Sequence, residues 1–235
     1  MSVDEVMKEL EAMGSASIRK VHASHGAREP FFGVKVGDMK TLIKRIKKDQ
    51  ALAEALFKTG NSDAMYMAGL INDDKAMTPE LLDAWADAAY WYMISEYTVA
   101  WVAAEGLYGW QMALKWIESP KENVACTGWS TLSHLVALKS DDALDLEALR
   151  GLLKRVEQTV HQQPNRVRYT MNGFVISVGC YVTALTPLAY EVGAKIGKVH
   201  VEMGGTDCKV PDVVDYIRKV EDMGRIGKKK KTVKC

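Results

Sequence analysis

The chain has 235 residues, of which 48% are hydrophobic and 26% are charged, a composition typical of a globular protein with a continuous core. Its formal net charge is +1, but six of the 31 basic residues lie in the last eleven positions, so the rest of the chain carries 25 basic and 30 acidic residues. Composition therefore excludes a body that is basic throughout and coats nucleic acid.

The beginning of the chain and its cysteines bear on its compartment. No charged segment followed by an apolar run opens the sequence, and no stretch of eighteen apolar residues occurs, so neither a signal peptide nor a membrane span is predicted. Four well-separated cysteines form no CxxC, which is typical of a reducing compartment. We therefore expect a cytoplasmic protein in which Cys126 and Cys180 are buried thiols.

Apolar residues recur at helical spacing from the start of the chain. Residues 2–13 and 15–25 are predicted to form two short helices. The segment 29–38 contains one proline and two glycines that break the pattern. We expect this segment to be a loop that places Phe31 or Phe32 in the core.

The later predicted helices share this periodicity and are separated by short stop signals. They span residues 38–46, 50–58, 61–73, 78–89, 90–105, 108–118, 121–138, 145–161, 165–184, 187–198 and 211–223. Tight turns and a pair spacing of roughly 35 to 45 residues are typical of helical repeats. We therefore predict an all-α superhelix, a solenoid of about six HEAT-like antiparallel helix pairs, with a compact helical bundle as the alternative.

The end of the chain is predicted to differ from the rest. Residues 1–223 would form a single HEAT-like domain, with a turn-rich loop at 204–211. Residues 224–235 contain too little apolar surface to order themselves, so we expect a flexible basic tail. Its cations are Arg225, Lys228, Lys229, Lys230, Lys231 and Lys234.

An aromatic ring and a carboxylate lie four residues apart in the predicted helix 90–105. Tyr92 and Glu96 therefore share one helical face, and Trp91 is adjacent. Such a pair suits a site that holds a base or sugar against a ring while the carboxylate stabilises developing positive charge. The structural alternative is that Trp91 and Tyr92 are packing residues and that Glu96 is solvated.

Two other predicted helices carry small or polar residues among apolar ones. In the segment 165–174, Asn172 is followed by Gly173, and a glycine inside a helix costs about 1 kcal/mol relative to alanine. Close approach of another helix or a groove floor would explain it. The segment 126–128, Cys-Thr-Gly, would likewise admit a neighbouring helix or a ligand close to the backbone.

Motifs for metals and phosphates are not convincing. His22 and His25 form an HxxH, but no third ligand joins them at a suitable spacing. The sequence contains neither a phosphate-binding glycine loop nor a GxSxG elbow. We therefore expect neither a metal site nor a cofactor.

The segment from Pro30 to Leu42, Pro-Phe-Phe-Gly-Val-Lys-Val-Gly-Asp-Met-Lys-Thr-Leu, precedes a helical-repeat body and resembles the AlkC/AlkD-like DNA alkylation repair superfamily. The resemblance covers roughly residues 30–190. Members of that superfamily are HEAT-like solenoids whose concave, positively charged surface holds duplex DNA. The active ones are DNA glycosylases that excise alkylated purines such as 3-methyladenine and 7-methylguanine.

The resemblance also implies site residues. Active members carry a tryptophan and, four residues later, an aspartate on one groove helix, and these positions fall on Tyr92 and Glu96. A further groove tryptophan falls near Phe174. A groove arginine falls near Thr127, and threonine replaces neither its charge nor its fork of donors. The residues expected in the groove are Trp91, Thr127, Arg168, Asn172 and Phe174, and the tail cations are expected to make non-specific DNA contacts.

Two functions remain open. In the first, the protein binds duplex DNA, including alkylated DNA, and excises alkylated purines as a DNA glycosylase, with Glu96 opposing the charge on the sugar. In the second, it is a non-catalytic HEAT-like solenoid that binds a DNA structure or acts as a scaffold for a protein partner. The missing arginine favours the second. We expect a monomer that does not associate with membranes.

Overall fold

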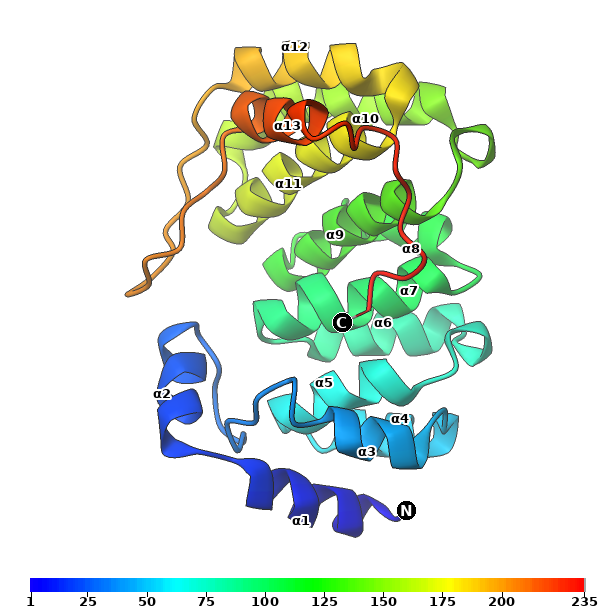
Figure 1. The fold of residues 1–235 in the computed structure, drawn as a ribbon, viewed down its shortest axis with the longest axis vertical. Helices are drawn as coiled ribbons and strands as arrows, with labels where there is room; N and C mark the ends of the chain where they lie inside the picture. The colour runs from blue at the N-terminus through cyan, green and yellow to red at the C-terminus, as the bar shows by residue number, and fades with distance from the viewer. Residues whose placement is uncertain (235) are drawn as a thin grey trace.

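The computed structural model describes residues 1–234, and within that range the chain forms helices and loops without a strand (Figure 1). The α-helices are α1 (Val3–Met13), α2 (Ala16–Ser24), α3 (Lys40–Ile46), α4 (Gln50–Lys58), α5 (Ser62–Ile71), α6 (Pro79–Ala88), α7 (Ala100–Glu105), α8 (Gly109–Trp116), α9 (Glu122–Leu138), α10 (Leu146–Thr159), α11 (Asn165–Tyr181), α12 (Thr186–Ile196) and α13 (Val213–Asp222). The short helices are η1 (Asp74–Ala76), the π-helix η2 (Met93–Val99), η3 (Asp141–Ala143), η4 (Val160–Gln162) and η5 (Thr183–Leu185).

Neighbouring helices pack together and follow one another along the long axis of the molecule (Figure 1). α4 packs on α5, α8 packs on α9, and α11 packs on both α9 and α12. Chain order is therefore kept along the stack, from α1 at one end to α12 at the other. The predicted all-α, HEAT-like solenoid is confirmed.

Local sequence determines where several helices begin. The Ser2 hydroxyl accepts a hydrogen bond from the Glu5 amide, and the Glu5 carboxylate accepts one from the Ser2 amide, which makes a capping box at the start of α1. Thr78 caps α6 and is followed by Pro79 at the first helical position. Both helices thus begin where their own residues satisfy the free amides.

Two hydrophobic clusters lie along the stack. The first extends mainly from Val6 in α1 to Trp116 in α8, and the second extends from Ala113 in α8 to Ile217 in α13. Helices α8 and α9 contribute to both clusters and so join the two halves. Cys126 and Cys180 are buried thiols, as predicted.

One buried carboxylate holds the irregular loop between α2 and α3. The oxygens of Asp63 accept hydrogen bonds from the backbone amides of Phe32, Gly33 and Val34 at 2.6 to 3.0 Å. Phe31 lies in the core with 4% of its surface exposed, which is one of the two predicted arrangements. Charge-assisted bonds of this kind are strong, so the loop is fixed against α5 although it has no regular structure.

The helix predicted at 90–105 is interrupted. A π-helical turn occupies Met93–Val99, and regular α-helix begins only at Ala100. The Thr98 hydroxyl donates to the carbonyl of Met93, five residues earlier, at 3.3 Å. Turns of this type occur mostly as single insertions in helices and are frequent at functional sites.

Between residues 1 and 234, no single helix is long and apolar enough to cross a membrane. The segments 165–181 and 183–196 reach the limit only in combination, and they are bent by 114° at their break.

The last residues differ from the sequence-based expectation. Instead of extending freely, residues 225–234 run back along the stack towards its middle (Figure 1). The Lys230 amide donates to the Ala137 carbonyl at 2.8 Å, and Val233 is only 9% exposed in the first cluster. The flexible-tail prediction is therefore wrong for these residues, because polar contacts with the body replace the apolar surface that the tail lacks.

Candidate nucleic-acid interface

Helices η2, α9 and α11 share one face of the stack, along which three adjoining cavities form a groove. The first cavity, of about 470 Å³, lies beside Tyr92 and the loop between α12 and α13. The second, of about 130 Å³, shares Tyr97 and Tyr169 with the first. The third, of about 730 Å³, shares His134 with the second and is bordered by the tail. These three cavities together make up the groove.

Five aromatic side chains surround the first cavity: Tyr90, Trp91, Tyr92, Tyr97 and Tyr169. The indole N–H of Trp91 donates at 2.7 Å to the backbone carbonyl of His25, the residue that follows α2, and this bond fixes the ring. Tyr92 meets Trp91 edge-on with 5.6 Å between ring centroids. Trp91 is only 7% exposed and packs in the first hydrophobic cluster, as its structural alternative predicted. The partly exposed ring of Tyr92 can stack on a nucleic-acid base, which is worth about 1 to 3 kcal/mol per base.

Glu96 and Arg166 form a bidentate ion pair beside these rings. Nε of Arg166 donates to Oε1 of Glu96 at 2.8 Å, and Nη2 donates to Oε2 at 2.5 Å. The Glu96 side chain is 5% exposed. The guanidinium carbon lies 4.6 Å from the ring centroid of Tyr92 and 4.2 Å from that of Tyr169. The two charges thus compensate each other, and the guanidinium is held between two rings.

Burial controls protonation in the middle of the groove. It raises the pKa of Glu96, and the hydrogen bonds and charge of Arg166 oppose that rise. Burial also raises the pKa of Tyr97 to about 12 and lowers the pKa of His134 to about 4, so both side chains are neutral at pH 7. These groups consequently bring no unpaired charge to the groove at neutral pH.

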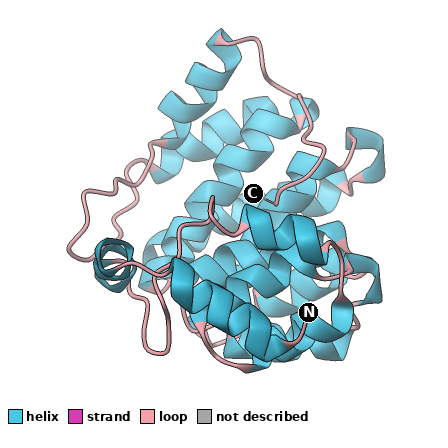
Figure 2. Ribbon diagram, turned by 60° about the horizontal axis from the view of Figure 1, so that its bottom comes forward, coloured by secondary structure: helices cyan, strands magenta, loops and turns pink. Residues whose placement is uncertain are grey.

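The loop between α12 and α13, residues 197–212, extends from the end of the stack towards α2 (Figure 1, Figure 2). Asn165 binds the backbone of Glu202 twice: its Nδ2 donates to the carbonyl at 2.9 Å and its Oδ1 accepts from the amide at 2.7 Å. At the far end, Sγ of Cys208 lies 3.7 Å from Nε2 of His25. The loop thus closes one side of the first cavity.

Comparison with known proteins identifies the family. Residues 6–185 match the family described as DNA alkylation repair enzyme. The chain belongs to this family.

Two relatives and one solved structure are similar over nearly the whole chain. Uncharacterized proteins of Listeria innocua and Listeria monocytogenes are each 32% identical over an alignment of 228 residues that covers 94% of this chain and 98% of theirs. A solved structure that is 39% identical covers all of both chains with a TM-score of 0.94. It represents a new family of proteins related to the HEAT-like repeat DNA glycosylases with affinity for branched DNA structures. The resemblance to DNA alkylation repair proteins is confirmed.

The structure brings some of the predicted site residues of this family member together. Trp91 and Tyr92 line the first cavity, and Glu96 lines the second. Glu96 is not solvated, because it is buried against Arg166. Arg168 does not line the three cavities; it is partly buried and donates to Oδ1 of Asn165 at 3.3 Å.

Three other predicted groove residues lie in the protein interior. Thr127 is fully buried, and its hydroxyl donates to a backbone carbonyl one turn earlier. Phe174 is fully buried with its ring centroid 5.2 Å from that of Trp129. Asn172 is 1% exposed, and its Nδ2 donates to the Pro211 carbonyl at 2.9 Å. The prediction that these three residues line the groove is therefore wrong, because all three are buried in contacts within the protein. An ungapped match gives a position along a helix but does not tell whether that position faces the groove or the hydrophobic core.

Gly128 and Gly173, two glycines within predicted helices, have different structural roles. A Cβ atom on Gly128 would lie 2.8 Å from the backbone nitrogen of Ile117, so glycine allows α8 and α9 to cross closely. No described atom lies within 4 Å of the corresponding position on Gly173, which lines the second cavity. The first is a tight helix crossing and the second is a groove floor.

Sequence reasoning missed Arg166, Tyr97 and Tyr169. A signal for two of them was present: Arg166, Tyr169, Gly173 and Ser177 recur at intervals of three and four, which marks one face of α11. Tyr97 lies five residues after Tyr92, and this spacing brings residues onto one face only in a π-helical turn.

Proposed function

We propose that this member of the DNA alkylation repair enzyme family binds branched DNA in the groove and does not excise bases. The observation that carries the proposal is the bidentate ion pair between Glu96 and Arg166. Excision requires a carboxylate that faces the sugar and opposes its developing positive charge. Both oxygens of Glu96 already accept charge-assisted hydrogen bonds, so its charge is compensated before a sugar arrives.

Releasing Glu96 for catalysis would be costly. Breaking a buried ion pair by removing one partner costs about 3 to 5 kcal/mol, and the 21% exposure of the Arg166 side chain favours the lower value. A barrier raised by about 3 kcal/mol slows a reaction by roughly two orders of magnitude. The ion pair therefore supports binding without excision.

The shape and chemistry of the groove support binding of a branched substrate. Base stacking is interrupted where duplex arms meet, which leaves base faces available to rings such as Tyr92 and Tyr97. Cations of the tail border the other end of the groove, where they can contact phosphates. The 39% identical structure belongs to proteins with affinity for branched DNA structures, which agrees with this proposal.

Binding and excision are tested side by side. Fluorescence anisotropy compares a four-way junction with a linear duplex of the same length, and a second assay measures release of 7-methylguanine or 3-methyladenine from methylated duplex. We expect tighter binding of the junction and no release above background. Release that is lost in Glu96→Gln would contradict the absence of excision, and equal affinity for the two DNAs would contradict the preference for branches.

The role of the rings is tested with matched variants. Tyr92→Ala is expected to weaken junction binding by roughly 5- to 150-fold, because it removes a stacking surface worth about 1 to 3 kcal/mol. Tyr92→Phe keeps the ring and should bind like the wild type. Tyr108→Ala is the control, since Tyr108 is exposed and does not line the groove.

A further inference from the structure

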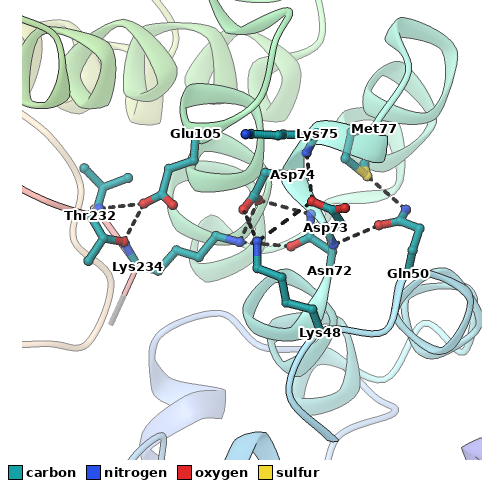
Figure 3. A network of polar contacts seen from close by, with 11 residues as sticks. Lys48, Gln50, Asn72, Asp73, Asp74, Lys75, Met77, Glu105, Thr232 and Lys234 are labelled. Atoms are coloured by element: carbon teal, nitrogen blue, oxygen red, sulfur yellow. Dashed lines mark hydrogen bonds and ion pairs between the residues drawn. The ribbon is translucent and has the colours of Figure 1, made fainter.

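Two of the six tail cations, Lys229 and Lys234, are paired with carboxylates of the body, and the other four are exposed. Lys234 is the more buried of the paired cations. Its Nζ lies 2.6 Å from Oδ1 of Asp74 and 3.0 Å from Oδ1 of Asn72, both in the segment between α5 and α6 (Figure 3). Its side chain is 12% exposed. Burial lowers the pKa of Lys234, and the charge of Asp74 opposes that change. A buried ammonium group that pairs with a carboxylate and an amide oxygen is an anchor and is not free to contact DNA.

Further contacts fix the tail along its length. The Gly227 amide donates to the Cys180 carbonyl of α11 at 2.9 Å. Nζ of Lys229 lies 2.8 Å from Oδ1 of Asp141. Glu105 accepts a hydrogen bond from the backbone amide of Val233 at 2.8 Å and another from the preceding hydroxyl (Figure 3). The tail is thus attached to both halves of the solenoid.

The remaining tail cations are Arg225, Lys228, Lys230 and Lys231. All four are exposed, and all four line the third cavity of the groove. Among the residues that the structure describes, no carboxylate lies within ion-pair distance of any of them. Nζ of Lys230 lies 5.8 Å from the ring centroid of Tyr181, beside the cavity. In a body that is acidic overall, they form a local positive wall.

Building on the function proposed above, we propose that the tail is a fixed phosphate-binding wall of the groove. Arg225, Lys228, Lys230 and Lys231 contact the backbone of the bound DNA, while the anchors Lys229 and Lys234 hold these cations at a set position. Because the cations are pre-positioned, ordering them on binding costs little, and their contacts depend on the path of the DNA. The wall therefore contributes both to affinity and to the preference for a branch.

The two sets of lysines predict opposite phenotypes in the full-length protein. Lys228→Gln/Lys230→Gln/Lys231→Gln should leave the tail anchored but reduce the slope of log K against log salt by about 3, because each lost phosphate contact removes roughly 0.9. Lys234→Gln should release the tail without removing the exposed cations. Its salt slope should remain close to that of the wild type, while its preference for a four-way junction over linear duplex falls several-fold.

Release of the tail is measured independently of DNA. Hydrogen exchange at the Lys230 and Val233 amides and tryptic cleavage within 228–231 should become faster in Lys234→Gln but not in Lys231→Gln, which loses the same charge. Equal tail protection in wild type and Lys234→Gln would overturn the anchoring role. An unchanged salt slope in the triple variant would overturn the phosphate contacts.

The same data separate this inference from the proposed function. Wild-type protein that binds linear and branched DNA equally, with a salt slope that the triple variant lowers, would refute the branch preference and support the phosphate contacts. Junction preference that survives in both Lys234→Gln and the triple variant would support the proposed function and overturn the wall.

Discussion

The guanidinium of Arg166 determines what Glu96 can do. A carboxylate in the middle of a DNA-binding groove repels phosphate, and Arg166 removes this repulsion by occupying both oxygens. Under the function proposed above, the same contact withdraws the carboxylate from catalysis. Under the same proposal, Arg166 does not substitute for the groove arginine expected near Thr127, because its Nε and Nη2 donate to Glu96.

This pairing predicts the behaviour of Glu96→Gln. The change leaves Arg166 without its counter-charge, so we expect the protein to lose about 3 kcal/mol of stability, the lower end of the range for a buried pair that loses one partner. DNA binding should become tighter and more salt-dependent, because the groove gains one uncompensated positive charge. Thermal unfolding and anisotropy titrations measure the two effects.

Glu118→Gln is the matched control for this change. Glu118 pairs with Arg155 on the surface, where an exposed ion pair contributes about 0 to 1 kcal/mol. Its loss should leave DNA binding unchanged. Weaker DNA binding by Glu96→Gln would show that Arg166 does not become available to phosphate.

His134 predicts how stability depends on pH. Its pKa is lowered from 6.5 to about 4 chiefly by burial, so the folded state disfavours the proton that the unfolded state binds. This contribution to stability is fully present above pH 6.5 and is lost as the pH falls towards 4. Linkage gives a loss of about 2 kcal/mol at pH 5.

Urea unfolding of the wild type and His134→Gln between pH 7.5 and pH 5 measures this dependence. The glutamine cannot be protonated, so the variant should lose about 2 kcal/mol less stability over that range. Parallel pH profiles for the two proteins would contradict a neutral His134 in the folded state.

At the scale of elements, the crossing of α8 and α9 depends on Gly128. A methyl group there would meet the backbone of Ile117 at 2.8 Å and the Ala113 carbonyl at 3.0 Å. We expect Gly128→Ala to destabilise the protein by about 1 to 3 kcal/mol, because the two backbones must move apart. Gly151→Ala in α10 is the control: its Cβ position meets no described atom within 4 Å, so alanine should stabilise the helix by about 0.5 to 1 kcal/mol. Equal effects of the two substitutions in thermal unfolding would contradict the close crossing.

The π-helix η2 changes which side chains meet. Regular α-helical spacing pairs Tyr92 with Glu96, whereas the wider turn places Tyr97 on the side of Tyr92, where both line the first cavity. The first cavity therefore gains the ring of Tyr97, which the four-residue spacing of Tyr92 and Glu96 does not predict. Its carboxylate is also deeper, because Glu96 turns towards α11 and reaches Arg166.

At the scale of the molecule, the tail connects elements that are distant along the stack. Deletion of the residues after Gly224 removes the buried side chain of Val233 and the ion pair of Lys234 with Asp74. We expect a loss of at least about 2 kcal/mol, with a fall in Tm of roughly 4 to 8 °C. Differential scanning calorimetry measures it, and Lys231→Gln, which removes an exposed charge, is the control. An unchanged Tm after deletion would restore the flexible tail.

The sequence by itself determined the class of fold and much of its local structure. The signals that define the helices act within one or two turns: the spacing of apolar residues, N-caps such as Thr78, and glycines that end a helix. They can therefore be recognised without knowing which other helices pack nearby. For the same reason the burial of Cys126 and Cys180 followed from their apolar surroundings. The aromatic side of the site, Trp91 and Tyr92, was also found from local pattern and resemblance.

Only the tertiary structure decided the rest of the site. The helices packed against α11 decide which of its faces is buried in the hydrophobic core and which lines the groove. Phe174 therefore lies in the core, while Arg166 reaches Glu96, seventy positions earlier in the chain. The tail is ordered because its lysines meet Asp74 and Asp141, and composition counts charges without locating their partners. Periodicity is a property of one element, whereas ion pairing between distant residues is fixed by how the elements stack.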